Sequence, residues 1–186
     1  MDTLEALQTR RTIPVVLPDA LPRETVEQLL QAANLAPNHY KVRPWHFVVL
    51  QGAARNRFGD LLAEILSAAQ PELPAAALDK ERAKALRAPL IIAVGVTKTD
   101  HPRATAAENL CAAAAASQNL LLAAHALGLG AIWRSGPTVE EPKVKAWLGL
   151  DPEQPLIGLI YIGLPDPAGP VPAPRPSYED RVTWME

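Results

Sequence analysis

The chain has 186 residues, which is enough for one domain with a substantial hydrophobic core. It carries 18 basic and 20 acidic residues, giving a formal net charge of −2, and it has no basic stripe. This balance argues against a protein that binds nucleic acid or a charged membrane surface, and it favours small molecules or protein as partners.

The cysteine content and the hydropathy of the chain indicate the cellular compartment in which the protein is expected. The only cysteine, Cys111, excludes an intrachain disulfide and any four-sulfur metal site. The first residues lack the basic region and apolar run of a signal peptide. The most apolar stretch, 110–133, is interrupted by polar residues and glycines, which predicts a buried helix and strand rather than a membrane span. We therefore expect a cytoplasmic protein.

The first predicted element is a short helix over 3–8, which runs into Arg10-Arg11-Thr12 before Pro14 breaks it. Two interpretations of the arginine pair are open. It can be a solvated cap that interacts with the helix dipole. Alternatively, it can bind an anion, because the guanidinium fork matches phosphate and a neighbouring hydroxyl adds a donor.

A second helix is predicted over 24–35, where apolar residues recur three and four positions apart. Pro37 ends it, and Pro44 biases the preceding residue away from helical angles. A β-rich run follows at 47–50. The stretch 36–47 between them is expected to be an extended, anchored loop that holds a ligand. Its two histidines, His39 and His46, have no nearby cysteine or carboxylate, so no metal site is expected.

Further elements follow from apolar periodicity and from breakers. The long helix contains a run of alanines at 112–116, which suits close approach of another backbone, either as the core axis or as a dimer seam. A charged helix at 79–87 suggests no chemistry. The predicted elements are helices over 55–69, 79–87, 104–127 and 140–148, a mobile connection over 70–77, a central strand over 88–96, and strands around 131–133 and over 156–164.

Glycines surround Arg134 and Ser135 in the segment after the long helix. They suit the close approach of a flat, phosphorylated ligand. The pair Gly128 and Gly130 is no dinucleotide fingerprint, because it follows a helix and precedes a strand, the reverse of that motif.

A proline-rich segment closes the chain. Six of the twelve residues from Pro165 to Pro176 are proline, which favours an extended arm over a packed helix or sheet. Because the arm ends in Tyr178 and Trp184, we expect it to lie on an apolar surface such as a second subunit. The predicted organisation is a domain over 1–164 and an arm over 165–186 that packs on the dimer partner.

The residues alone therefore suggest a site for an aromatic phosphate, with arginines and hydroxyls in separate loops, tryptophans beside two of them, and no catalytic triad spacing. The segments that carry this pattern also resemble a known family. Arg10-Arg11-Thr12, 36–39, Pro44-Trp45-His46-Phe47 and 130–136 together resemble the nitroreductase family of FMN-dependent NAD(P)H oxidoreductases, in its compact, single-domain bacterial branch.

The resemblance implies an α+β fold in which helices flank a central, mostly antiparallel sheet, and an intertwined homodimer with two FMN sites at the interface. It implies no catalytic side chain, because FMN performs the chemistry. The nicotinamide nucleotide, NADH or NADPH, is expected near Ala123, Ala124, His125, Ala126, Leu127 and Gly128. The FMN contacts that it implies are Arg10, Arg11, Thr12, Trp133, Arg134 and Ser135, with Leu35 and His39 from the other subunit.

The function implied is hydride transfer from NAD(P)H through FMN to a nitroaromatic, quinone or similar small acceptor by a ping-pong cycle. Two alternatives are a non-catalytic FMN carrier or sensor, and an oxygen-using relative that processes flavin or dehalogenates. The sequence departs from the family pattern by Thr12 in place of a serine and by Lys41 and Arg43 in place of amides. The cation that stabilises reduced flavin is therefore open among Arg10, Lys41 and Arg43.

Overall fold

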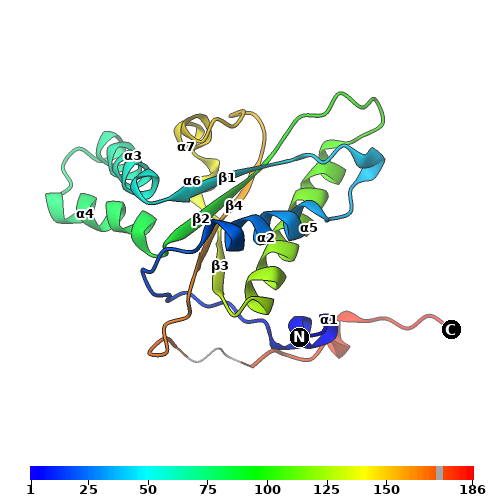
Figure 1. The fold of residues 1–186 in the computed structure, drawn as a ribbon. Coiled ribbons are helices and arrows are strands. Elements are labelled where there is room, and N and C mark those ends of the chain that lie inside the picture. The colour runs from blue at the N-terminus through cyan, green and yellow to red at the C-terminus, as the bar shows by residue number, and fades with distance from the viewer. Residues whose placement is uncertain (171–173) are drawn as a thin grey trace.

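The computed structural model describes residues 1–170 and 174–186, and a four-stranded sheet lies at its centre (Figure 1). The strand order is β1-β2-β4-β3, and each neighbouring pair is antiparallel. With helices on both faces, the architecture is the α+β class expected from the sequence. The strands are β1 (Trp45–Gln51), β2 (Leu90–Val96), β3 (Gly130–Arg134) and β4 (Leu156–Gly163).

Strand β2 is the centre of the core. All seven of its residues are buried, and it pairs with β1 on one side and β4 on the other. Leu90, Ile92 and Val94 belong to one apolar cluster, whereas Ile91 and Ala93 belong to a second. Because strand side chains alternate between faces, a continuous apolar run requires cover on both sides. The prediction of a central strand is confirmed.

Helices cover the two faces of the sheet unequally. The first cluster lies between the sheet and helices α2 and α5. The second lies between the sheet and α3, α6 and α7, and α4 packs against α3 away from the sheet (Figure 1). The helices are α1 (Thr3–Thr9), α2 (Arg23–Asn34), α3 (Ala53–Ala69), α4 (Ala75–Ala83), α5 (Ala106–Ala126), α6 (Pro137–Glu140) and α7 (Pro142–Trp147), with short 3₁₀ turns η1 (His39–Lys41), η2 (Lys84–Leu86) and η3 (Glu179–Arg181).

Two predicted boundaries are wrong, and the reasons are local. The connection expected over 70–77 is shorter, because α4 begins at Ala75 directly after Pro74, a residue suited to a helix start. The single helix expected over 140–148 is two helices that break at Glu141, since Pro142 cannot continue a preceding helix and instead starts α7.

The N-terminal segment contacts the segment that follows β4. Val16 forms an isolated antiparallel bridge with Pro165, and the arm then runs beside α1 before its last residues leave the body (Figure 1). Residues 171–173 of the expected arm lie outside the described residues. In the described parts of the chain, no helix is both long enough and apolar enough to cross a bilayer.

Candidate functional site

Arg11 lies at the C-terminal end of α1 and caps it. Its Nη1 donates hydrogen bonds to the carbonyl oxygens of Gln8 and Arg10, at 2.8 and 3.0 Å. Carbonyl groups in the last turn of a helix lack partners within the helix and attract cations. For Arg11 the capping interpretation therefore holds, and in this conformation part of its guanidinium is not free for a ligand.

Arg175 of the arm reaches the same helix end. Its Nη1 donates to the carbonyl oxygen of Leu7 at 2.9 Å, and its Nη2 donates to that of Arg10 at 2.7 Å. These two bonds hold the described part of the arm against α1 of its own chain. The sequence analysis did not single out Arg175. The available signal was a lone basic residue in a proline-rich segment.

Three arginines therefore share one place without a compensating carboxylate. Burial is the largest cause of the lowered pKa of Arg10, and the charges of Arg175 and Arg11 lower this pKa further. Over 1–170 and 174–186, no carboxylate oxygen lies within 4.0 Å of a guanidinium nitrogen of these three residues. Such a cluster is stabilised by an anion, and phosphate matches the guanidinium fork.

The end of α5 lies beside this arginine cluster. The Nε2 atom of His125 is 2.7 Å from the hydroxyl of Thr9, and burial together with Arg10 and Arg11 lowers the His125 pKa. Ala124 is fully buried in the single chain. Of the six residues expected near the nicotinamide nucleotide, Ala126, Leu127 and Gly128 are exposed, while Ala123 and His125 are partly buried.

Strand β3 connects the arginine cluster to a cleft. The N–H of Ile13 donates to the carbonyl oxygen of Ala131 at 3.0 Å, which places the segment after Arg10 beside the start of β3. At the other end of the strand, Trp133, Arg134 and Ser135 line a cleft of about 410 Å³. At about 3.3 Å per residue, five-residue β3 separates the two places by roughly 13 Å.

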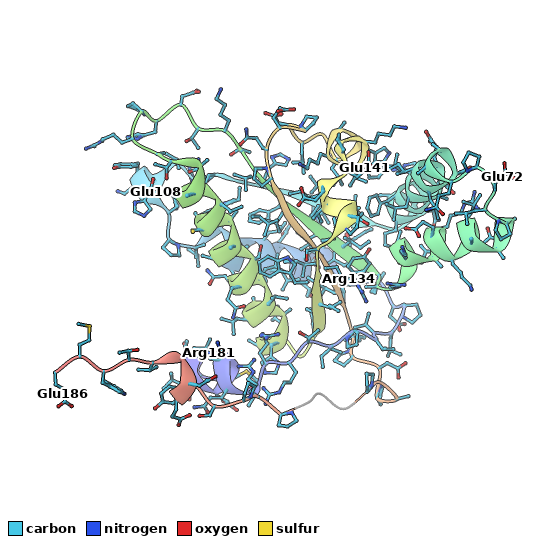
Figure 2. All side chains as sticks on the ribbon, turned by 180° about the vertical axis from the view of Figure 1, so that it is seen from behind. Glu72, Glu108, Arg134, Glu141, Arg181 and Glu186 are labelled. Carbon is cyan, nitrogen blue, oxygen red and sulfur yellow. The ribbon has the colours of Figure 1, made fainter. Side chains whose placement is uncertain are left out.

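Arg134 is the most informative residue in the cleft (Figure 2). Its Nε atom is buried without a hydrogen-bond partner, and its guanidinium lies 5.5 Å from the centre of the Tyr161 ring. Burial raises the pKa of Tyr161, against the opposing charges of Arg134 and Arg87. A buried donor without a partner is unfavourable unless a ligand accepts from it. The cleft therefore fits a ligand with acceptor atoms.

Two more cations line the cleft, and the sequence analysis missed both. Lys84 and Arg87 come from η2 and its C-cap, in the segment predicted to carry no chemistry. Lys84 pairs with Glu81 at 2.6 Å. No carboxylate lies within 4.0 Å of Arg87 in the described residues. A charged helix gives no local signal for a site, because only the tertiary fold brings η2 to the end of β3.

Trp133 is held on the opposite side of β3 from Arg134. Its Nε1 donates to the carbonyl oxygen of Ile157 at 3.1 Å, and it packs against the cluster under α5. Gly158 leaves room for the indole, since a Cβ atom there would overlap it. The neighbouring side chains of Trp133 and Arg134 therefore have different surroundings, as alternation along a strand requires.

The loop after α2 holds the remaining predicted residues in an unusual conformation. Tyr40, Lys41 and Arg43 all have positive φ angles, of 54°, 57° and 47°. Such angles are uncommon for residues other than glycine. Asn38 secures the turn, because its Oδ1 accepts from the N–H of Arg43 at 2.8 Å and its Nδ2 donates to Ala36 at 3.3 Å. The sequence analysis expected an extended loop, whereas the structure has a tight 3₁₀ turn.

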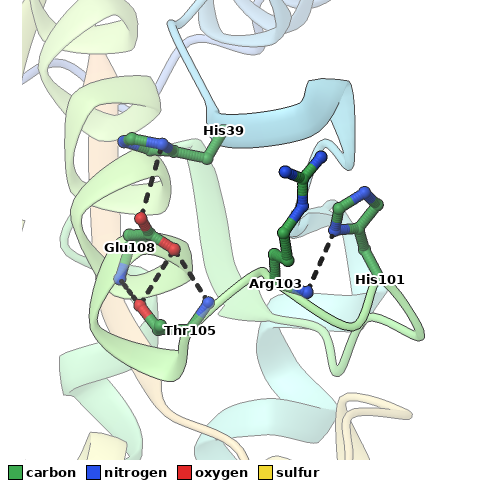
Figure 3. Close-up of polar contacts among 5 residues, drawn as sticks. All are labelled: His39, His101, Arg103, Thr105 and Glu108. Atoms are coloured by element: carbon green, nitrogen blue, oxygen red, sulfur yellow. Dashed lines mark hydrogen bonds and ion pairs between the residues drawn. The ribbon is translucent and has the colours of Figure 1, made fainter.

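His39 points at the N-terminal end of α5. Its Nδ1 lies 3.4 Å from Oε1 of Glu108, and the other carboxylate oxygen accepts from the N–H and the hydroxyl of Thr105 (Figure 3). The hydrogen bonds from Thr105 are the main cause of the lowered pKa of Glu108, and His39 contributes. A pocket of about 310 Å³ lies here, bounded by Pro37, Asn38, His39, Glu108, Cys111, Ala112 and Ala115.

The predicted residues therefore form two groups in one chain. From Glu108 to His125, α5 is about 25 Å long at 1.5 Å per residue. His39 lies beside Glu108 at one end of this stretch, and the arginine cluster lies beside His125 at the other. Leu35 belongs to the same loop as His39, and its side chain is 81% exposed. A single chain cannot bring both groups to one ligand of modest length.

Comparison with known proteins gives a consistent family assignment. The model of the Nitroreductase family matches residues 7–164. The curated protein "Putative NAD(P)H nitroreductase YdjA" of Escherichia coli is 35% identical over 165 residues, which is 89% of each chain. The "5,6-dimethylbenzimidazole synthase" of Rhodospirillum rubrum is 35% identical over 183 residues, covering 92% of this chain and 86% of the relative.

A solved structure agrees with this assignment. The "putative nitroreductase in complex with fmn" from Desulfovibrio desulfuricans is 26% identical and superimposes with a TM-score of 0.74, covering 100% of this chain and 98% of that one. The match extends over the sheet, both helical layers and the segments that hold the candidate site. The chain belongs to the nitroreductase family.

Proposed function

We propose that this protein is an FMN-dependent oxidoreductase that transfers a hydride from NADH or NADPH to a nitroaromatic, quinone or similar small acceptor. The observation that carries the proposal is the unpartnered Nε of Arg134 in a cleft that is connected by β3 to a carboxylate-free arginine cluster. One end suits a ring with acceptor atoms and the other suits a phosphate. The FMN in the D. desulfuricans relative supports this choice of ligand.

Each group of residues has a distinct part in the proposal. Arg10 binds the phosphate, and Arg175 adds the guanidinium N–H groups that the carbonyl oxygens of Leu7 and Arg10 leave free, with Arg11 and Thr12 beside them. Arg134 and Ser135 hold the ring end, with Arg87 as a further cation, and Trp133 packs behind them on the α5 side of β3. Bound FMN supplies the hydride chemistry, so the chain needs to position it and tune its charge. Arg134 is better placed than Arg10, Lys41 or Arg43 to stabilise negative charge on a reduced ring, because of these four it is the one that lines the cleft proposed for the ring.

The second half of the site is proposed to come from a partner copy. Leu35 and His39 are too far along α5 from the arginine cluster of their own chain to complete its site. A homodimer in which this loop reaches the other subunit's cleft resolves the separation. The arm after Leu164 and the outward face of α5 supply further surface for the contact. The nicotinamide nucleotide is proposed to reach the exposed end of α5 at 126–128, and the cytoplasm is the proposed location.

The rival functions remain distinguishable. A flavin carrier or sensor would bind FMN without reduction by NAD(P)H. The 35% identity to the R. rubrum 5,6-dimethylbenzimidazole synthase over most of both chains adds a synthase as a candidate, beside the oxygen-using relative that would process flavin or dehalogenate. Reduced FMN supplied with oxygen would then be consumed rather than reoxidised.

Replacing Arg134 with alanine is expected to weaken FMN binding about tenfold or more, since a hydrogen bond to a charged group contributes about 1.5–3 kcal/mol. Titration of the apoprotein with FMN, followed by flavin fluorescence, measures this. The matched control is Arg57→Ala, an exposed arginine on α3. Equal FMN affinity in the wild type and in Arg134→Ala would remove Arg134 from the site.

The proposed cycle is ping-pong, because one cavity of this size serves both the nucleotide and the acceptor in turn. Initial rates at varied NAD(P)H and varied quinone are expected to give parallel double-reciprocal lines. Anaerobic mixing with either nucleotide should bleach the flavin absorbance. Intersecting lines contradict the shared cavity, and a flavin that neither nucleotide reduces supports the carrier.

A further inference from the structure

A cluster of one cation and two rings lies beside His39. The ring of Tyr40 stacks on that of His101, with centroids 4.1 Å apart and planes 15° apart. The guanidinium of Arg103 lies 4.9 Å from the centre of the Tyr40 ring. The N–H of Arg103 also donates to Nδ1 of His101 at 3.3 Å (Figure 3). Tyr40, His101 and Arg103 are called the rim cluster below.

The rim cluster lies next to His39, the residue that we propose contacts the flavin of the partner subunit. The rings of His39 and Tyr40 have centroids 6.2 Å apart. His39 borders the pocket of about 310 Å³ beside Glu108. A ligand whose reactive ring lies at His39 would therefore have its other end near Tyr40 and Arg103.

The charge of Arg103 is available to such a ligand. The nearest acid on α5, Glu108, has one carboxylate oxygen engaged by Thr105 and the other beside His39. In the residues that the structure describes, no carboxylate oxygen lies within 4.0 Å of an Arg103 side-chain nitrogen. A guanidinium next to aromatic rings can bind a phosphate and stack on a base at the same time.

The backbone below the rim cluster is held in a conformation that needs explanation. Tyr40 is one of the three residues with positive φ, and the side chain of Asn38 fixes the turn. Such angles are unfavourable for residues other than glycine, and strain of this kind is concentrated at ligand sites. With this backbone conformation, the Tyr40 ring lies flat against the ring of His101.

We propose that the rim cluster binds the adenosine 2′-phosphate of NADPH, so that the protein selects NADPH over NADH; this inference rests on the proposed function. Arg103 pairs with the phosphate, and the His101 ring, which is backed by the Tyr40 ring, provides a surface for adenine. The aromatic platform favours a nucleotide over a small anionic acceptor, which needs only a cation. The nicotinamide then lies toward His39 and the partner's flavin. The rim cluster thus replaces the exposed end of α5 at 126–128 as the adenosine site, and the α5 end becomes the alternative placement in the tests below.

Binding of adenosine 2′,5′-bisphosphate tests the proposal without any turnover. Calorimetric titration of the FMN-loaded protein is expected to show binding at least tenfold tighter than that of 5′-AMP, and Arg103→Ala is expected to abolish this difference. Tyr40→Leu should weaken both nucleotides, and Arg57→Ala neither. Equal affinity for the two nucleotides in the wild type, or an unchanged ratio in Arg103→Ala, overturns the proposal.

Steady-state kinetics distinguish binding of NADPH at the rim cluster from binding elsewhere. Arg103→Ala should lower kcat/KM at least tenfold for NADPH and leave NADH unchanged. Loss of bisphosphate binding in Ala126→Asp but not in Arg103→Ala would place the nucleotide only at the end of α5. If Arg103→Ala lowers kcat/KM for the acceptor 4-nitrobenzoate alone, and leaves 4-nitrobenzamide and NADPH unaffected, Arg103 binds the acceptor instead. Either of these two outcomes contradicts the proposal. If neither NADH nor NADPH reduces the flavin, the proposed function is refuted. The bisphosphate titration measures binding alone, so it tests the rim cluster independently of that result.

Discussion

FMN binding is expected to weaken at least a hundredfold when Arg10 and Arg175 are both replaced by alanine. Each guanidinium is proposed to donate to the phosphate, and a hydrogen bond to a charged group contributes about 1.5–3 kcal/mol, so that two give roughly 3–6 kcal/mol. The two residues also lie together without a carboxylate, so their positive charges repel each other in the free protein and a bound phosphate offsets this repulsion. The double variant lacks the repulsion, and therefore gains less from binding the phosphate.

Fluorescence titration of the apoprotein measures the effect. The matched control is the double variant Arg57→Ala, Arg181→Ala, which removes two exposed arginines of α3 and η3. Circular dichroism checks that α1 keeps its fold, since Arg175 also bonds to carbonyl groups of Leu7 and Arg10. A double variant that binds FMN as tightly as the wild type would show that the phosphate lies elsewhere.

The second large effect is expected from Leu35→Asp. The side chain of Leu35 is 81% exposed in its own chain, so the substitution leaves that chain's fold intact. In the proposed dimer the same side chain is buried at the partner's flavin. Loss of about 1.5–3 kcal/mol of burial, together with about 1–3 kcal/mol for an unpaired charge near the phosphorylated ligand, predicts FMN binding that is weaker by about a hundredfold or more.

The control for this prediction is Leu35→Met, which keeps an apolar side chain at the same position. Sedimentation of the wild type is expected to give twice the chain mass of 20.0 kDa. An apoprotein of Leu35→Asp should melt at the wild-type temperature if only the shared site is affected. A monomeric wild type that holds FMN tightly, or a Leu35→Asp variant with normal affinity, contradicts the role of this loop.

Local patterns were sufficient to predict the scaffold. The continuous apolar run of β2 and the periodic helices α2, α3 and α5 were recognised because burial dictates residue type along an element. The Arg10 and Arg11 pair was visible as either a cap or an anion site. The structure shows that Arg11 is used as a cap and that the cluster around Arg10 lacks a carboxylate.

What the sequence did not reveal depends on tertiary contacts. Arg87 enters the cleft because η2 packs near the end of β3, and nothing in a charged helix signals this position. Arg175 reaches α1 from far along the chain. The left-handed angles of Tyr40 and Lys41 oppose their intrinsic preferences and depend on the hydrogen bonds of Asn38. Local preference cannot predict a conformation that the surroundings impose.

FMN binding by a mixed dimer tests the shared site most directly. One subunit carries Arg10→Ala and Arg175→Ala, and the other carries Leu35→Asp. Each variant alone is expected to bind FMN weakly, but the mixed dimer contains one site built entirely from unaltered residues. A site shared between subunits predicts one tightly bound FMN per mixed dimer, when the mixed dimer is isolated through a different affinity tag on each subunit. A mixed dimer that binds FMN as weakly as its two parents would contradict a site shared between subunits.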